Sequence, residues 1–338
     1  MQPNKTLWYN CIDGLNLNSI KQDIIDTKPE RIVLLSEVEW QIQGLDKNFV
    51  DLCKDNNTVL NIVHGTYSSD YHNQLYKNIG LDINNVTFWG TQFFNLIGWI
   101  FSNNYRGYEN YPIPTHYTYP FLNMNCRSHV HRCTLIDELA GRNLIEKGRV
   151  SWHDHLEENQ DFIFKYFNRK NKLRLGDDFE TKLDSQLIPS CYFDTFMVLV
   201  TEATLNAPFF TEKTVMPLLF KRPFLVIAGK NHNSEFFKLG FEPYDEIFDY
   251  SYDSIDDLSL RVSKAVDNIE NIIGRDYISL YDKIKEKIEH NFHLAQKISK
   301  DINLIPDIVK ERLMLTKFGY YNHSHIDSRY EVFINLCN

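Results

Sequence analysis

The chain lacks any apolar run long enough to cross a membrane. Its longest candidate, residues 93–101, falls well short of the roughly 18 apolar residues that a span requires, and it contains Asn95. The amino terminus, from Met1 to Lys5, has no apolar segment of the kind found in a secretory signal. We therefore expect a cytoplasmic protein without a membrane span.

Motifs for metals and common cofactors are also absent. The six cysteines form no Cys-x-x-Cys pair, and neither Asp-x-Asp nor His-Glu-x-x-His occurs, so no metal site or disulfide framework is indicated. Gly-x-x-x-x-Gly-Lys-Ser/Thr and Gly-x-Gly-x-x-Gly are missing too, which argues against a sugar-phosphate kinase or epimerase. We expect neither a metal nor a bound cofactor.

Positive charge is in deficit, because 36 Lys and Arg residues stand against 45 Asp and Glu residues, a net charge of −9. Sequence-independent binding of nucleic acid needs a basic face, so nucleic acid is a disfavoured partner. A local basic patch would be enough for such binding. What is present is an ordinary globular composition in 338 residues, 43% hydrophobic and 24% charged. That length suits two domains.

Apolar runs separated by helical patterns indicate an α/β fold with parallel sheets. The stretch 103–119, rich in Asn, Tyr and Pro, has no periodicity and predicts a loop between domains. Strands are predicted over 32–36, 59–63, 86–89, 196–200, 224–227 and 247–249, and long helices over 255–273 and 277–298. We expect Rossmann-like domains over 1–122 and 123–300, and a helical segment over 301–338 that either crosses back to the first domain or extends the second.

Two of these strands, 196–200 and 224–227, flank a short helix and form the most informative stretch of the chain. Each strand ends in polar or small residues, and ligands of open α/β sheets bind beyond the carboxyl ends of strands. Thr211 is a good N-cap, and Glu212 suits a first helical turn. The amino end of a helix beside a lysine is a favourable binding site for phosphate. We therefore expect one ligand-binding crevice formed by Glu202, Thr211, Glu212 and Lys213.

This stretch resembles the donor-sugar motif of GT-B glycosyltransferases of the fucosyltransferase type, glycosyltransferase family 10. That motif has a strand ending in Phe-Glu-Asn, a loop, Thr-Glu-Lys, a helix and a Val-Pro-Val-Val-x-Gly-like strand. Its counterparts here are residues 200–202, 211–213 and 222–229. The resemblance implies that the two glutamates and the lysine contact the sugar and ribose-phosphate parts of a nucleotide-diphosphate sugar. The chain departs from the motif at Thr201, where the family usually has Phe, and at Pro217 inside the expected helix.

A second segment, residues 125–132, is similar to the small-polar loop that precedes the first donor-domain helix in this family. An arginine there clamps the diphosphate with its planar donor fork. Arg127 is our first choice and Arg132 the second, because the spacing does not decide between them. The helix that follows is predicted to end with Gly148 at its C′ position. Tyr252 is a candidate to stack on the nucleobase, with burial in the core as the alternative.

Glycosyl transfer also needs a general base for the acceptor hydroxyl. We expect the base in the first domain, at the carboxyl end of a strand. Glu37 and Glu39 follow the first predicted strand, and His64 follows the second. Glu37 is the first choice, and Asp70 and His72 lie further along the second loop.

The sequence therefore predicts two Rossmann-like domains facing a central cleft, as in GT-B enzymes. The resemblance implies inverting, metal-independent transfer from a nucleotide-diphosphate sugar, with a GDP-sugar favoured, to the hydroxyl of a glycan or, less favoured, of a modified nucleic-acid base. Golgi members carry a membrane anchor, so its absence indicates a soluble microbial protein, or a viral one in the host cytosol. The alternative is a non-catalytic nucleotide- or sugar-binding protein of the same fold.

Overall fold

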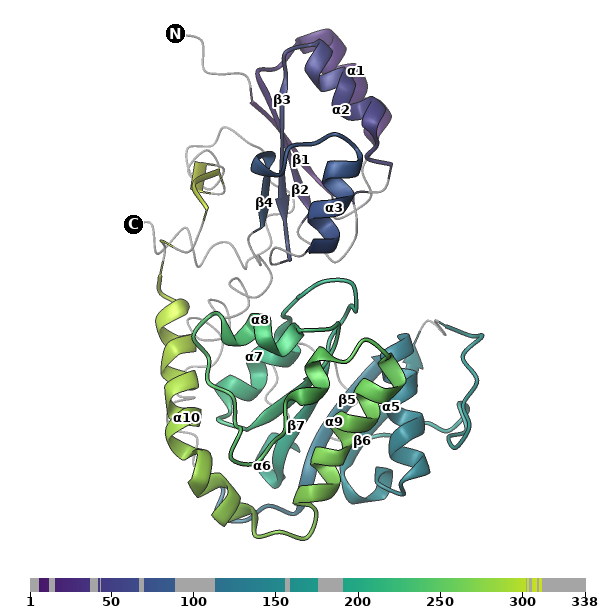
Figure 1. The fold of residues 1–338 in the computed structure, drawn as a ribbon, viewed down its shortest axis with the longest axis vertical. Helices are drawn as coiled ribbons and strands as arrows, with labels where there is room; N and C mark the ends of the chain where they lie inside the picture. The colour runs from purple at the N-terminus through teal and green to yellow at the C-terminus, as the bar shows by residue number, and fades with distance from the viewer. Residues whose placement is uncertain are drawn as a thin grey trace. The chain divides into compact units, whose positions relative to one another are not determined.

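The chain divides into two compact units (Figure 1). The first comprises residues 1–95, 206–209 and 301–338, and the second comprises residues 96–205 and 210–300. The structure, a computed structural model, describes residues 6–11, 16–36, 42, 44–66, 70–88, 113–155, 159–175, 191–301, 303, 306–308, 310 and 311.

The first unit contains a parallel four-stranded sheet in the order β1-β2-β3-β4. Its elements are β1 (Thr6–Asn10), α1 (Leu17–Thr27), β2 (Arg31–Ser36), α2 (Lys47–Asp55), β3 (Val59–His64), α3 (Asp70–Asn78) and β4 (Val86–Phe88). Asn16 and Asp46 cap α1 and α2 by accepting a backbone N–H bond. Because the strands pair in chain order, right-handed crossovers place the three helices on one face of the sheet.

The second unit contains another parallel four-stranded sheet, in the order β6-β5-β7-β8. Its elements are β5 (Tyr119–Arg127), α5 (Val130–Gly141), β6 (Arg149–His155), α6 (Cys191–Asp194), β7 (Thr195–Thr201), α7 (Glu212–Leu219), β8 (Phe224–Ile227), α8 (His232–Phe237), α9 (Leu258–Ile272) and α10 (Tyr277–Ile298). The chain runs from β5 to β6 on one side, and β7 then pairs with the other edge of β5. The strand order therefore reverses between β5 and β7, and such a switch point is where open α/β sheets bind ligands.

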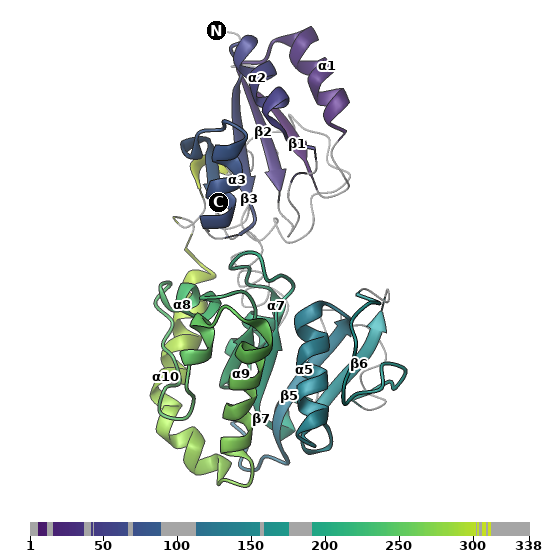
Figure 2. The ribbon, with the colours of Figure 1, turned by 45° about the vertical axis from the view of Figure 1, so that its right-hand side comes forward.

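Helices cover both faces of this second sheet. α5 and α9 lie side by side (Figure 2), and Arg142 at the end of α5 forms ion pairs with Asp267 and Glu270 of α9. α7 packs against α10, and because the β7–β8 crossover runs in the direction opposite to the β5–β6 crossover, α7 lies on the other face. β7 and β8 are buried along their whole length, as expected for strands covered on both sides.

The predicted α/β class with parallel sheets is confirmed, and so are the predicted strands in the first unit and the strands β7 and β8. The strand predicted over 247–249 does not form. In its place, Asn268 of α9 binds the Asp249 backbone, accepting from its N–H at 2.7 Å and donating to its carbonyl at 3.1 Å. A side-chain amide thus takes the hydrogen bonds that a neighbouring strand would otherwise make.

The boundary between the units lies between residues 95 and 96 rather than at residue 122. β5 begins at Tyr119, and Tyr117 and Phe121 are already buried, so the end of the stretch predicted as a linker belongs to the second sheet. Gly148 does not end α5. An ideal Cβ at Gly148 would lie 2.4 Å from the ring of Phe121, so glycine is needed there for packing. Residues 301–338 group with the first unit, where Glu311 pairs with Arg31 of β2.

Candidate functional site

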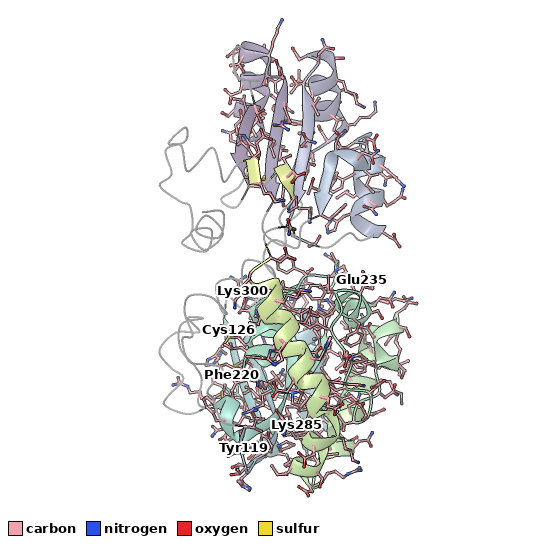
Figure 3. The ribbon with its side chains drawn as sticks, turned by 90° about the vertical axis from the view of Figure 1, so that its left-hand side faces the viewer. Tyr119, Cys126, Phe220, Glu235, Lys285 and Lys300 are labelled. Carbon is pink, nitrogen blue, oxygen red and sulfur yellow. The ribbon has the colours of Figure 1, made fainter. Side chains whose placement is uncertain are left out.

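Most of the residues singled out in the sequence follow the carboxyl ends of β5 and β7, at the switch point of the second sheet. β5 ends at Arg127, and its loop leads into α5, whereas β7 ends at Thr201 and is followed directly by Glu202. Figure 3 labels Tyr119 and Cys126 near the two ends of β5, and the Cys126 end is the one with the candidate site. The fold thus brings together two segments that are more than 70 residues apart, as the contact of His131 with Glu202 shows.

Glu202 is 0% exposed, and both oxygens of its carboxylate are used within the protein. Oε1 accepts from the backbone N–H of Thr211 at 3.0 Å and from the hydroxyl of Thr214 at 2.5 Å. Oε2 accepts from the hydroxyl of Thr211 at 2.6 Å and from the N–H of Ala203 at 3.3 Å. The resemblance implied that Glu202 contacts the donor, but in the structure its carboxylate holds the first turn of α7.

The first turn of α7 forms as the sequence predicted. Thr211 is the N-cap, and its hydroxyl accepts from the N–H of Lys213 at 3.3 Å. Glu212 and Lys213 form an ion pair of 2.6 Å and remain 39% and 27% exposed. Burial raises the pKa of Glu212, but the charge and hydrogen bond of Lys213 outweigh it, so the pKa lies below its ordinary value. Pro217 lies inside α7, which continues for two residues beyond it.

The backbone carbonyl of Glu202 is bound by α5. His131 Nε2 lies 2.6 Å from this oxygen and Arg132 Nη2 lies 3.0 Å from it. Because a carbonyl only accepts, Nε2 carries the His131 proton. Burial, followed by the charge of Arg132, lowers the pKa of His131 to about 3, so this imidazole is neutral at physiological pH.

The two candidate arginines differ in exposure. Arg132 is 3% exposed, and its guanidinium donates to the carbonyls of Glu202 and Thr201. Arg127 is exposed at the end of β5. Arg132 is therefore part of the framework, and Arg127 is the arginine that an anion can reach.

A cationic cluster surrounds His129 at the amino end of α5. Burial, followed by the charges of Arg132, Arg127 and Lys213, lowers the pKa of His129 to about 4, so all three cations lie within electrostatic range of its ring. His129 is the N-cap of α5 but makes no side-chain cap hydrogen bond, and the first turn of α5 has no acidic residue. Since the first N–H groups of a helix have no acceptor within the helix, this end attracts anions.

The anion-binding position that the geometry favours is thus at the amino end of α5, whereas the sequence predicted it at the amino end of α7. The amino end of α7 already holds the Glu202 carboxylate and carries Glu212 in its first turn. These two negative charges compensate the helix dipole at that end. Lys213 projects from the same turn and is the part of α7 that contributes to the cationic cluster.

A partly buried ion pair, which could not be predicted from the sequence, supports the β5–α5 loop from the side of β6. Arg169 donates to both oxygens of Asp154, at 2.7 and 3.0 Å, and to the hydroxyl of Ser128 at 3.2 Å. Asp154 is 7% exposed and has a φ of 50°, a strained conformation for this residue. Burial raises the pKa of Asp154, but the hydrogen bonds from Arg169 and Ser128 outweigh it and lower the pKa. No local motif marks this pair, because only the fold brings its members together.

A buried polar ladder crosses the sheet just below the site. The Asn123 amide donates to the carbonyl of Leu199 at 2.7 Å, and the Asn125 amide donates to the side-chain oxygen of Asn123. The Thr201 hydroxyl donates to the side-chain oxygen of Asn125 at 2.6 Å. Asn123, Asn125 and Thr201 are each at most 1% exposed, so these bonds satisfy groups that water does not reach.

Tyr252 lies in the core, which was the alternative to base stacking. Its side chain is 1% exposed, and burial raises its pKa. Its hydroxyl donates to the carbonyl of Val226 at 3.1 Å and accepts from the Asn233 amide at 3.3 Å. No face of this ring is open to a nucleobase.

Of the candidate bases, Glu37 and Glu39 lie outside the described residues. His64 is 0% exposed at the end of β3. Its Nδ1 accepts from the N–H of Thr66 at 3.3 Å, so the proton of the neutral ring resides on Nε2. Burial, and then the nearby His72, lowers the pKa of His64 to about 3. A general base needs a free lone pair facing its substrate, and this lone pair is already engaged.

Among the described residues, no group of three or more His, Cys, Asp or Glu side chains is arranged to hold a metal ion. No helix in that part of the chain combines the length and the hydropathy that a membrane span requires. Comparisons with protein-family models, with curated proteins and with solved structures gave no match.

Proposed function

We propose that the protein is a glycosyltransferase that moves a sugar from a nucleotide-diphosphate sugar to an acceptor hydroxyl. The observation that carries the proposal is the pair of cations Arg127 and Lys213 near His129 at the amino end of α5, beside the switch point of a sheet covered on both faces. Ligands of such sheets bind at that point, and phosphates bind at helix amino ends. Arg127 and Lys213 are both reachable from solvent, and we assign one of them to each phosphate of the donor.

In the proposed reaction, the acceptor oxygen attacks the anomeric carbon and forms the new C–O bond. The bond from that carbon to the phosphate oxygen breaks, and its electron pair leaves with the nucleoside diphosphate. Arg127 and Lys213 stabilise the charge that develops on this leaving group, a role that positioned cations perform well. The hydroxyl proton passes to a general base, for which Glu37 remains our first candidate, followed by Glu39.

The proposal also includes four further features that the resemblance to the fucosyltransferase family implies. These are a GT-B arrangement in which the first unit supplies the base across a cleft, inversion at the anomeric carbon, a GDP-sugar donor and a glycan acceptor in the cytosol. Side-chain cations rather than a metal would hold the diphosphate, consistent with the absence of Asp-x-Asp from the sequence.

Nucleotide binding tests the site directly. A thermal-shift screen of GDP, UDP, CDP, ADP and TDP would select the base, since a ligand that binds the native state raises the melting temperature. Calorimetric titration of the selected diphosphate would then compare wild type with Arg127→Gln and Lys213→Met. We expect each substitution to weaken binding by at least about tenfold, because each removes a charge-assisted hydrogen bond worth roughly 1.5–3 kcal/mol.

The matched control is Lys285→Met, which removes the same charge from an exposed position on α10. Figure 3 labels Lys285 toward the Tyr119 end of β5, the end remote from Cys126. This variant should bind like wild type. Unchanged affinity in both Arg127→Gln and Lys213→Met, with folding intact, would refute the site.

The rival function, a non-catalytic nucleotide- or sugar-binding protein of the same fold, has support from Glu202, because the glutamate expected to contact the sugar is occupied within the protein. The rival predicts the same nucleotide affinity but no turnover. The discriminating assay measures release of nucleoside diphosphate from the GDP-sugar in the presence of candidate glycan acceptors. Acceptor-dependent release supports the enzyme, whereas tight binding without release to any acceptor supports the rival.

A further inference from the structure

We propose that Glu202 is a positioning residue that fixes the two cation-bearing segments at the separation required by a diphosphate, and so makes the site prefer a diphosphate to a monophosphate. The inference rests on the proposed function. It assigns Glu202 no contact with the ligand, because the side chain is 0% exposed and both carboxylate oxygens are taken.

The side chain of Glu202 holds the segment that carries Lys213. Its carboxylate accepts four hydrogen bonds, three of which come from Thr211 and Thr214 at the amino end of α7. Thr211 in turn accepts from the backbone N–H of Lys213. Hydrogen bonds to a buried carboxylate are among the stronger ones in proteins, so the position of the Lys213 backbone depends on Glu202.

The main chain of Glu202 holds the segment that follows Arg127. Its carbonyl accepts from His131 at 2.6 Å and from Arg132 at 3.0 Å, both in the first turn of α5. One residue therefore binds the amino ends of two helices, α5 through its carbonyl and α7 through its carboxylate. The ion pair Asp154–Arg169 supports the β5–α5 loop from the opposite side, so this loop is fixed at both flanks.

A monophosphate needs only one of the two cations, whereas a diphosphate bridges both. The relative position of Arg127 and Lys213 thus contributes to diphosphate affinity and contributes nothing to the binding of the nucleoside. Loss of the link through Glu202 should leave the nucleoside contacts in place and reduce the extra affinity that the second phosphate provides. A purely structural role would instead lower the affinity for every ligand to a similar degree.

Glu202→Gln is the decisive substitution because it keeps the shape of the side chain. A glutamine has one acceptor oxygen in place of two, and its amide group cannot accept. At least two of the four donors that face the carboxylate therefore lose their acceptor. The control is Glu235→Gln on α8, which removes the same charge from a glutamate whose partner is the exposed Lys238.

The experiment is calorimetric titration with GDP, GMP and guanosine, or with the corresponding uridine series if the thermal-shift screen selects uracil. In wild type and Glu235→Gln we expect the diphosphate to bind at least about tenfold more tightly than the monophosphate. In Glu202→Gln we expect this ratio to fall to within about threefold, with monophosphate and nucleoside affinities little changed. A wild-type ratio in folded Glu202→Gln overturns the inference, and so does an equal loss of affinity for all three ligands.

Failure of the inference is distinguishable from failure of the proposed function. If wild type binds no nucleoside diphosphate, the proposed function fails and the inference falls with it. If wild type binds and Lys213→Met weakens binding, the proposed function stands whatever Glu202→Gln does. Should Glu202→Gln not fold, Thr214→Val decides, since it removes a single donor to Oε1. A reduced ratio in Thr214→Val supports the inference, and an unchanged ratio overturns it.

Discussion

Thr201 is the residue at which this chain departs most plainly from the fucosyltransferase motif, and its hydroxyl explains why a phenylalanine would not fit here. The hydroxyl donates at 2.6 Å to the side-chain oxygen of Asn125, and both residues are 1% exposed. Thr201→Val keeps the β-branched shape but leaves that oxygen without its donor. We expect the free energy of unfolding to fall by about 1–3 kcal/mol, the usual cost of an unsatisfied buried polar group, as measured by urea denaturation.

Thr134→Val provides the control for this substitution. The Thr134 hydroxyl donates to the Val130 carbonyl of its own helix, at an exposed position, so its loss should change the free energy of unfolding by no more than about 0.5 kcal/mol. Equal effects of the two substitutions would mean that the polar ladder under the site contributes nothing special to stability.

At the scale of elements, the loop between β7 and α7 is held against the end of β8 by a close backbone contact. An ideal Cβ at Gly229 would lie 2.3 Å from the carbonyl oxygen of Leu205. Gly229→Ala must therefore displace this loop, and with it the start of α7. We expect a loss of about 1–3 kcal/mol in the free energy of unfolding, together with weaker binding of the nucleoside diphosphate.

Gly274→Ala separates these two effects. Gly274 has a φ of 75° with nothing within 4 Å of an ideal Cβ, so alanine there costs about 1–2 kcal/mol of backbone strain and should leave nucleotide affinity unchanged. If Gly229→Ala also left affinity unchanged, the position of the β7–α7 loop would not matter for binding.

The elements also show which parts of the fold can be predicted from this sequence. Apolar runs in the sequence predicted four strands correctly, namely β2, β3, β7 and β8. Strands that are buried on both faces consist of such runs. β5 and β6 escaped prediction because polar residues interrupt them. Asn123, Asn125 and Ser151 are buried yet bonded to partners in the same sheet, and those partners are known only once the strands lie side by side.

At the scale of the whole molecule, the residues that the sequence singled out around β5 and β7 lie together, but their burial differs from what the sequence indicated. Thr211, Glu212 and Lys213 are adjacent in the chain, so the N-cap and the ion pair could be predicted locally. The burial of Glu202 and Arg132 could not, because Glu202 is bound from α5 and α7, which lie on opposite faces of the sheet, and Arg132 binds carbonyls that follow a distant strand. The reversal of strand order at the carboxyl edge of β5 and β7, where we propose the binding site, depends on pairing between distant segments, which no local pattern encodes.

The central claim is that a nucleoside diphosphate binds at the carboxyl edge of β5 and β7, and hydrogen exchange followed by mass spectrometry tests it most directly. With saturating nucleotide, the account predicts slower amide exchange in peptides that cover residues 126–134 and 202–215, and unchanged exchange along α10. Protection confined to other segments, or binding without protection of either peptide, would contradict the account.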